Sequence, residues 1–64
     1  MDDMTWNPGE RVTWTRDSHT YNGVVEVQRR GWVLVTLDEP RESPHGWTEH
    51  RMMVRNSDIQ QMST

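Results

Sequence analysis

Histidine and carboxylate side chains are the first candidates for chemistry in this sequence. His19, His45 and His50 are residue types that bind metal ions, but they lack the i, i+2 or i, i+4 spacing that brings ligands together on one element. The acidic residues Asp38, Glu39 and Glu42 lie in a proline-rich stretch, where a solvated surface is the ordinary interpretation. We therefore expect no metal site, no cofactor and no catalysis.

Aromatic and arginine side chains form the second chemical group. The chain has 4 Trp and 1 Tyr, and all 7 of its basic residues are Arg. One Trp buries about 200 Å² when it is covered. Aromatic and Arg side chains dominate the energetics of protein interfaces, because they combine apolar area with planar hydrogen-bonding groups. This group predicts recognition of a partner rather than a reaction.

Length and composition limit the size of the core. The chain has 64 residues, of which 31% are hydrophobic, so it forms one domain at most. It contains no Cys, which excludes disulfides and thiolate metal sites. The formal net charge is −3, which disfavours nonspecific nucleic-acid binding because that binding depends on an excess of cations. Stability should be marginal without a partner or a second copy.

Hydropathy and the first residues bear on the cellular location. No apolar run approaches the roughly 18 residues that a membrane span requires. Residues 1–4 are acidic at two positions and show no apolar signal segment. We expect a soluble, cytoplasmic protein with no membrane partner.

The residue types favour an all-β fold, since Val and Thr are abundant and Ala and Phe are absent. A turn at Trp6–Gly9 separates an N-terminal tail from the first strand. Strict alternation over residues 10–16 predicts a half-buried strand with Val12 and Trp14 on one face. Residues 17–23 collect turn formers and predict a long projecting loop, in which Asn22-Gly23 suits positive φ.

The middle of the chain predicts a β-hairpin. Residues 24–28 alternate with Val25 and Val27 turned inward, residues 29–31 form a compact link, and residues 32–37 return as the second strand. Both faces of that second strand are apolar, which is typical of a central strand. Its expected inward side chains are Val33, Val35 and Leu37, and its expected outward side chains are Trp32 and Leu34.

The last third of the chain is less regular. Residues 38–46 contain Pro40 and Pro44 and predict a solvated loop that cannot continue a ladder. Residues 47–55 predict a strand in which Met52 and Val54 share a face. Residues 56–59 suit one short helical turn, residues 59–62 a last edge strand, and residues 63–64 should fray.

These segments together resemble SH3-like barrels of the KOW and Tudor type. The similarity lies in Gly9-Glu10-Arg11-Val12, in Asn22–Val27, in Trp32–Asp38 and in Val54–Ile59, which ends on a Ser-Asp-aliphatic turn. The resemblance implies a small barrel of about five antiparallel strands over residues 9–62, with residues 1–8 as a flexible tail. It also implies a non-enzymatic binding module, used on nucleic acid, on ribosomal or transcription machinery or on protein tails.

An aromatic surface is the sharpest functional expectation. Trp32 and Leu34 face away from the predicted core, so either a partner covers them or the loop at residues 17–23 or the Trp6 segment does. A second candidate surface contains Trp47 and Met53, whose thioether adapts to different partners. The residues expected to bind are Trp32, Leu34, Tyr21, Arg29, Arg30, Trp47 and Met53.

Three functions compete for this surface. The first is binding of a protein partner, in the manner of a small bacterial or phage regulatory adaptor; a Lys-free, Trp-rich composition is compatible with such a source. The second is single-stranded nucleic-acid binding by stacking on Trp32 and Tyr21 beside Arg29 and Arg30, where each stacked base contributes about 1 to 3 kcal/mol. The third is a homo-oligomeric structural role, in which a second copy covers the apolar faces.

Overall fold

One antiparallel sheet of five strands makes up the fold. The structure is a computed structural model, and it describes residues 5–62. Its elements are β1 (Arg11–Arg16), β2 (His19–Arg29), β3 (Trp32–Glu42), β4 (Thr48–Arg55), the 3-10 turn η1 (Asn56–Asp58) and β5 (Gln60–Gln61). The spatial order is β4-β3-β2-β1-β5. The all-β class, the five antiparallel strands and the short turn before the last strand are confirmed.

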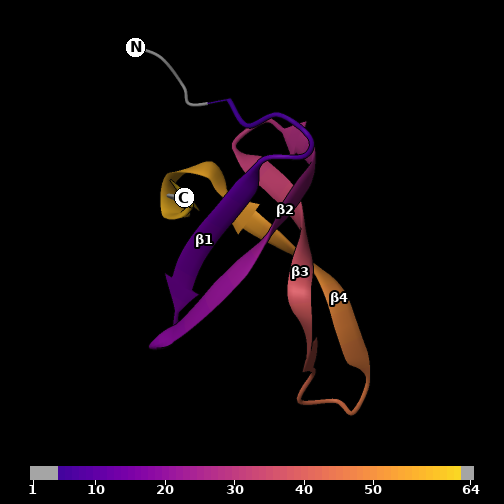
Figure 1. Cartoon of the computed structure of the whole chain (residues 1–64). Helices are drawn as coiled ribbons and strands as arrows, with labels where there is room; N and C mark the ends of the chain where they lie inside the picture. Colours follow the sequence, from indigo (N-terminus) through magenta and orange to yellow (C-terminus); the bar gives the residue numbers. More distant parts are fainter. Residues whose placement is uncertain (1–4, 63–64) are drawn as a thin grey trace.

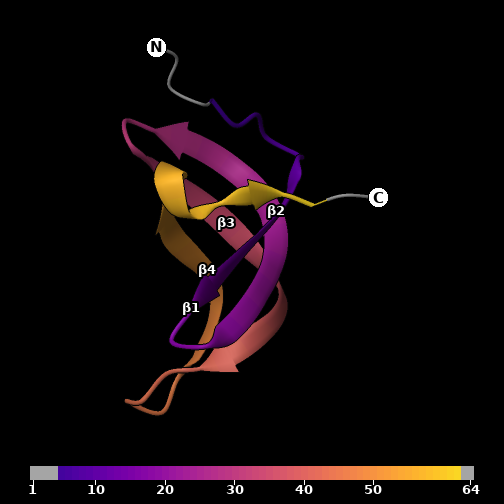
Figure 2. The same cartoon turned by 90° about the vertical axis from the view of Figure 1, so that its left-hand side faces the viewer.

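The sheet curls around a single core (Figures 1 and 2). Strands β1 and β4 are not neighbours in the sheet, yet their inward side chains join one buried cluster. The inward faces of β1, β3 and β4 follow the sequence alternation, because a strand's side chains alternate between its two faces. The buried apolar side chains are Trp6, Val12, Trp14, Val25, Val33, Val35, Leu37, Met52, Val54 and Ile59.

Trp6 belongs to this core, although the sequence places it in the tail of residues 1–8. Its side chain is only 4% exposed. Its backbone N–H donates to Oε1 of Gln28 at 2.8 Å, and Gly9 N–H donates to the carbonyl of Val25 at 2.9 Å. The packed part of the chain therefore begins before residue 9. The remaining expectations for the two ends, a tail containing Asp2 and Asp3 and fraying at residues 63–64, lie outside the described residues.

The expected long loop at residues 17–23 is a two-residue turn. Asp17 and Ser18 have φ of 53° and 65°, which is the backbone of a tight hairpin turn whose twist matches the flanking strands. Strand β2 therefore starts at His19 and pairs with β1 from there on. Asn22 and Gly23 are strand residues, and Gly23 is needed for close packing: an added Cβ would lie 2.4 Å from the Thr36 carbonyl oxygen.

The expected loop at residues 38–46 is also shorter, because β3 continues to Glu42. The β3–β4 ladder is interrupted between Thr36 and Arg41 and then resumes with Arg41 opposite Glu49. Pro40 lies within this irregular stretch, where a residue without an N–H is tolerated because no ladder bond depends on it. The connection to β4 is the turn at residues 43–47.

A bulge in β2 corrects the expectation for Val27. Val25 lies opposite Val35, but Val27 lies opposite Leu34, so β2 carries one extra residue, Glu26, at this point. The bulge turns Val27 to the face away from the core, where it is half-buried. Gln28 takes the core-side position opposite Val33 and links Trp6 to η1, because its Nε2 also donates to Oδ1 of Asn56 at 2.9 Å.

Candidate functional site

The outer face of β2, β3 and β4, turned away from the core, carries a compact aromatic and apolar surface. Directly opposed residues in neighbouring strands share a face, so the register places the side chains in cross-strand rows. One row is Val27, Leu34 and Met53, and the next is Arg29, Trp32 and Arg55. We call these six residues the Trp32 surface.

Exposure distinguishes the Trp32 surface from the core behind it. Trp32 is 40% exposed and Met53 is 44% exposed, whereas Val33 and Val54, on the opposite side of the same strands, are fully buried. Leu34 is half-buried between its two cross-strand neighbours. Neither the β1–β2 hairpin nor the Trp6 segment seals Trp32 from solvent. A partner that covers this face would bury apolar area that the monomer leaves in water.

Arginine side chains surround Trp32. The guanidinium of Arg55 lies over the Trp32 ring, 5.3 Å from its centroid, which is a cation–π arrangement. Arg29 lies directly opposite Trp32 in the β2–β3 ladder, and Arg30 lies in the connecting turn. The sequence did not indicate Arg55 as part of this surface, because only the β3–β4 register brings residues 32 and 55 together.

Ion pairs make the charge around Trp32 uneven. Three Arg residues pair with carboxylates: Arg11 with Asp38, Arg41 with Glu49 at 3.5 Å, and Arg51 with Glu26 at 3.1 Å. Within residues 5–62, the other four, Arg16, Arg29, Arg30 and Arg55, have no carboxylate within 4.0 Å. Three of these four unpaired arginines, Arg29, Arg30 and Arg55, therefore place positive charge around Trp32 in a protein of net negative charge, while Arg16 lies apart at the end of β1.

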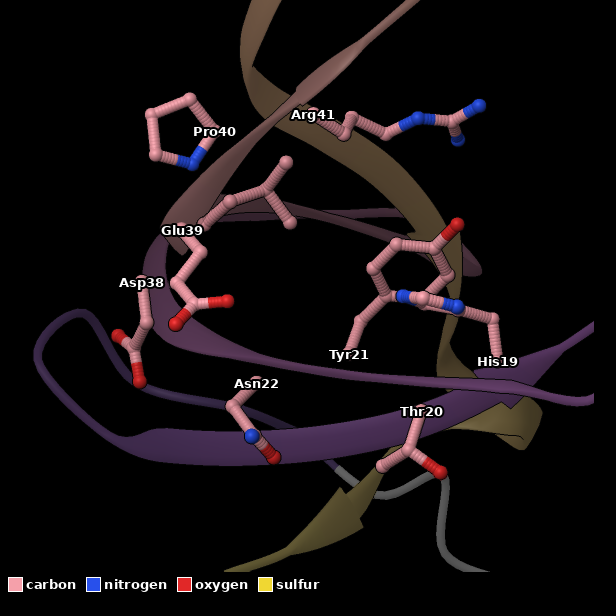
Figure 3. Close-up of a pocket in the computed structure, with 9 residues that line it drawn as sticks. His19, Thr20, Tyr21, Asn22, Asp38, Glu39, Pro40 and Arg41 are labelled. Atoms are coloured by element: carbon pink, nitrogen blue, oxygen red, sulfur yellow. The ribbon is translucent and has the colours of Figure 1, made fainter.

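Tyr21 lies elsewhere, in a pocket between the start of β2 and the end of β3 (Figure 3). It is opposite Trp14 in the ladder and stacks on it with ring centroids 5.6 Å apart, so it packs on the core side. His19 contacts the same ring, and Arg41 lies over it at 5.7 Å. The structure thus separates Tyr21 from Trp32, which begins β3 opposite the far end of β2 and lies on the other face of the sheet.

The pocket holds about 230 Å³ and is lined mainly by polar side chains. Two of its lining residues form ion pairs with residues outside the pocket, Asp38 with Arg11 and Arg41 with Glu49. Among the described residues, no three His, Asp or Glu side chains come together closely enough to hold a metal ion.

Trp47 and Met53, expected to form one second surface, are separated by the structure. Trp47 precedes β4 and stacks on His45 with ring centroids 5.1 Å apart, at the turn end of the β3–β4 hairpin. Met53 lies opposite Leu34 and belongs to the Trp32 surface. Of the seven residues expected to bind, Trp32, Leu34, Arg29 and Met53 converge, Arg30 flanks them, and Tyr21 and Trp47 stand apart.

Comparison with known proteins adds no relative to this picture: no family model, no curated protein and no solved structure matches the chain. Within residues 5–62, no helix has the length and apolar character needed to cross a bilayer.

Proposed function

We propose that this protein is a non-catalytic module that binds a protein partner through the Trp32 surface. The main support is the apolar row Val27, Leu34 and Met53, which lies beside the exposed Trp32. At the same end of the sheet, Arg29, Arg30 and Arg55 have no carboxylate partner among the described residues. Aromatic burial supplies binding energy, and Arg forks orient an acidic surface. The resemblance to KOW and Tudor modules agrees with a binding role.

The partner chemistry follows from the same residues. An aliphatic and thioether row of this kind favours apolar side chains, which a nucleic acid does not offer. Arg55 already covers part of one face of the Trp32 ring, which leaves less of that ring free for base stacking. Protein binding is therefore favoured over nucleic-acid binding, and the partner should present carboxylates around an apolar centre.

Comparative capture with matched variants tests the proposal. Wild type, Trp32→Ser and Trp47→Ser are immobilised and exposed to a nuclease-treated lysate of the cells that produce the protein. The two tryptophans form a matched pair, because both are exposed and both lie against a neighbouring side chain. A partner should be retained by wild type and by Trp47→Ser and lost by Trp32→Ser. Identical capture by all three would contradict the proposal.

Salt and dilution separate the remaining alternatives. Affinity for single-stranded DNA would fall steeply between two salt concentrations because binding releases counterions, whereas a protein contact centred on Trp32 should fall much less, since salt screens only the arginine–carboxylate contacts around the apolar centre. Self-association would raise the melting temperature with protein concentration. We expect a melting temperature that stays constant over a wide dilution series and weak, salt-sensitive DNA binding at most.

A further inference from the structure

Strand β4 lies at the edge of the sheet. One backbone hydrogen bond shows which of its N–H and C=O groups point to β3 and which point to the open edge. Asn56 N–H donates to the Gly31 carbonyl at 3.0 Å, so residues 31 and 56 form a hydrogen-bonded pair. Bonded and non-bonded pairs alternate in an antiparallel ladder. The bonded pairs are then Val33–Val54 and Val35–Met52, and the backbone groups of Arg51, Met53 and Arg55 point away from β3 to the open edge.

The same three residues carry their side chains on the outer face. Alternation places Arg51, Met53 and Arg55 on one side of β4, and all three are exposed. The edge thus presents cation, apolar group and cation at alternate positions, directly beside Leu34 and Trp32. Arg51 already pairs with Glu26, but its side chain is 65% exposed and its fork retains free N–H donors.

A second copy of the chain fits this edge poorly in the register centred on Met53, and Glu49, which could face Arg55 in a shifted register, is already paired with Arg41. Antiparallel pairing of β4 with itself about Met53 would place Arg51 of each copy opposite Arg55 of the other. Like charges directly opposite one another in a ladder are destabilising. A strand of opposite charge would instead place carboxylates against both arginines and an apolar side chain against Met53. Charge complementarity therefore selects an acidic partner strand.

We infer that the partner contributes an extended segment with the pattern acid-x-apolar-x-acid, which pairs with the β4 edge as an additional strand. Such strand addition gives affinity through main-chain hydrogen bonds and specificity through alternate side chains. The inference rests on the proposed function and adds to it the conformation and the sequence pattern of the segment that is bound. If the partner binds the outer face without pairing with β4, the proposed function stands and the inference of an added strand is refuted.

Selection from a random heptapeptide library tests the sequence pattern. Immobilised wild type should enrich peptides with Asp or Glu at two positions four residues apart and Leu, Ile, Val or Met midway between them. Enrichment of basic or Pro-rich peptides, or no enrichment, would overturn the inference. The most enriched peptide is then synthesised and used as the probe in the two measurements that follow.

Removal of one edge N–H tests the strand pairing. Met53→Pro deletes an N–H that points to the open edge, which an edge strand tolerates, and Met53→Thr is the matched control that keeps the N–H while changing the side chain. We expect the peptide to bind Met53→Pro about tenfold more weakly than Met53→Thr, the effect of one lost main-chain hydrogen bond. Equal affinities for the two variants would overturn strand pairing.

Amide hydrogen exchange in the wild type gives a reading that does not depend on the Pro variant folding. In the free protein, the amides of Arg51, Met53 and Arg55 should exchange faster than those of Met52 and Val54. Saturation with the peptide should slow the three edge amides at least as strongly as any others in the sheet. Edge amides that are unaffected by the peptide would overturn the inference, as would edge amides already protected in the free protein.

Discussion

Met53 lies directly opposite Leu34 on the outer face, in a pair whose backbone groups do not bond to one another. Side chains approach most closely in such non-bonded pairs, so the thioether and the isobutyl group pack side by side. Val27 reaches the other side of Leu34 only because of the bulge at Glu26. An apolar row three strands wide therefore crosses the surface, and Trp32 lies in the adjacent row.

The two neighbouring methionines should respond very differently to truncation. Met52 is 8% exposed and packs in the core, so Met52→Ala should lower the free energy of unfolding by about 2 to 5 kcal/mol. Met53 is 44% exposed, so Met53→Ala should lower it by less than about 1 kcal/mol. Urea unfolding of both variants measures the difference. Equal losses would show that the inward and outward faces of β4 are assigned wrongly.

Gly23 should not tolerate a methyl group. An added Cβ would lie 2.5 Å from Cγ1 of Val35 and still closer to the Thr36 carbonyl, so Gly23→Ala should destabilise the fold by about 1 to 3 kcal/mol or more. Gly31→Asn is the control, because Gly31 has open space around it and Asn tolerates its φ of 77°. The control should cost less than about 1 kcal/mol in chemical denaturation. A neutral Gly23→Ala would refute the close approach of β2 to β3.

Gln28 should contribute to stability through three hydrogen bonds that join separate segments. Its side chain accepts from Trp6 N–H and donates to the Trp32 carbonyl at 3.1 Å and to Asn56. Gln28→Leu keeps the approximate volume but leaves the Trp6 N–H without this acceptor, which should cost about 1 to 3 kcal/mol. Gln60→Leu, at an exposed position, is the control and should be nearly neutral. If the two substitutions lower the free energy of unfolding equally, the hydrogen bonds of Gln28 do not stabilise the fold.

The β1–β2 turn offers a stabilising change. Asp17 and Ser18 both adopt left-handed backbone, which costs free energy for residues with a Cβ. Replacing the pair by Asn-Gly should raise the free energy of unfolding by about 0.5 to 1 kcal/mol, because this dipeptide prefers that turn. Ser18→Ala should give no such gain. If the Asn-Gly variant is no more stable than wild type, the turn is not the two-residue one described.

Sequence alternation predicted the fold well where a strand keeps a strict period of two. Val12 with Trp14, Val33 with Val35 and Met52 with Val54 were all assigned to the correct face, and the turn after Arg55 was located. The face of Val27 was wrong, because a bulge inserts one residue without any marked sequence signal. The loops predicted at residues 17–23 and 38–46 are shorter in the structure. His, Thr and Pro residues at their ends belong to strands, because the neighbouring residues pair with the adjacent strand.

The candidate site was predictable in part for the same reason. The outward position of Trp32 and Leu34 follows from the period of their own strand. Partners from other strands depend on register, which a single sequence does not reveal, so Arg55 was missed and Tyr21 was placed beside Trp32. Trp6 was assigned to the tail because a turn signal follows it; its backbone N–H bonds to Gln28, twenty-two residues away, and its side chain packs in the core.

Mapping the contact surface by nuclear magnetic resonance tests the central claim most directly. The captured partner is titrated into isotope-labelled protein while the Trp indole N–H and Met methyl signals are followed. We predict that the Trp32 indole and Met53 methyl signals shift or broaden in proportion to the partner added, while the exposed Trp47 indole keeps its position. Changes confined to Trp47 and His45, or to the pocket around Tyr21, would contradict the account.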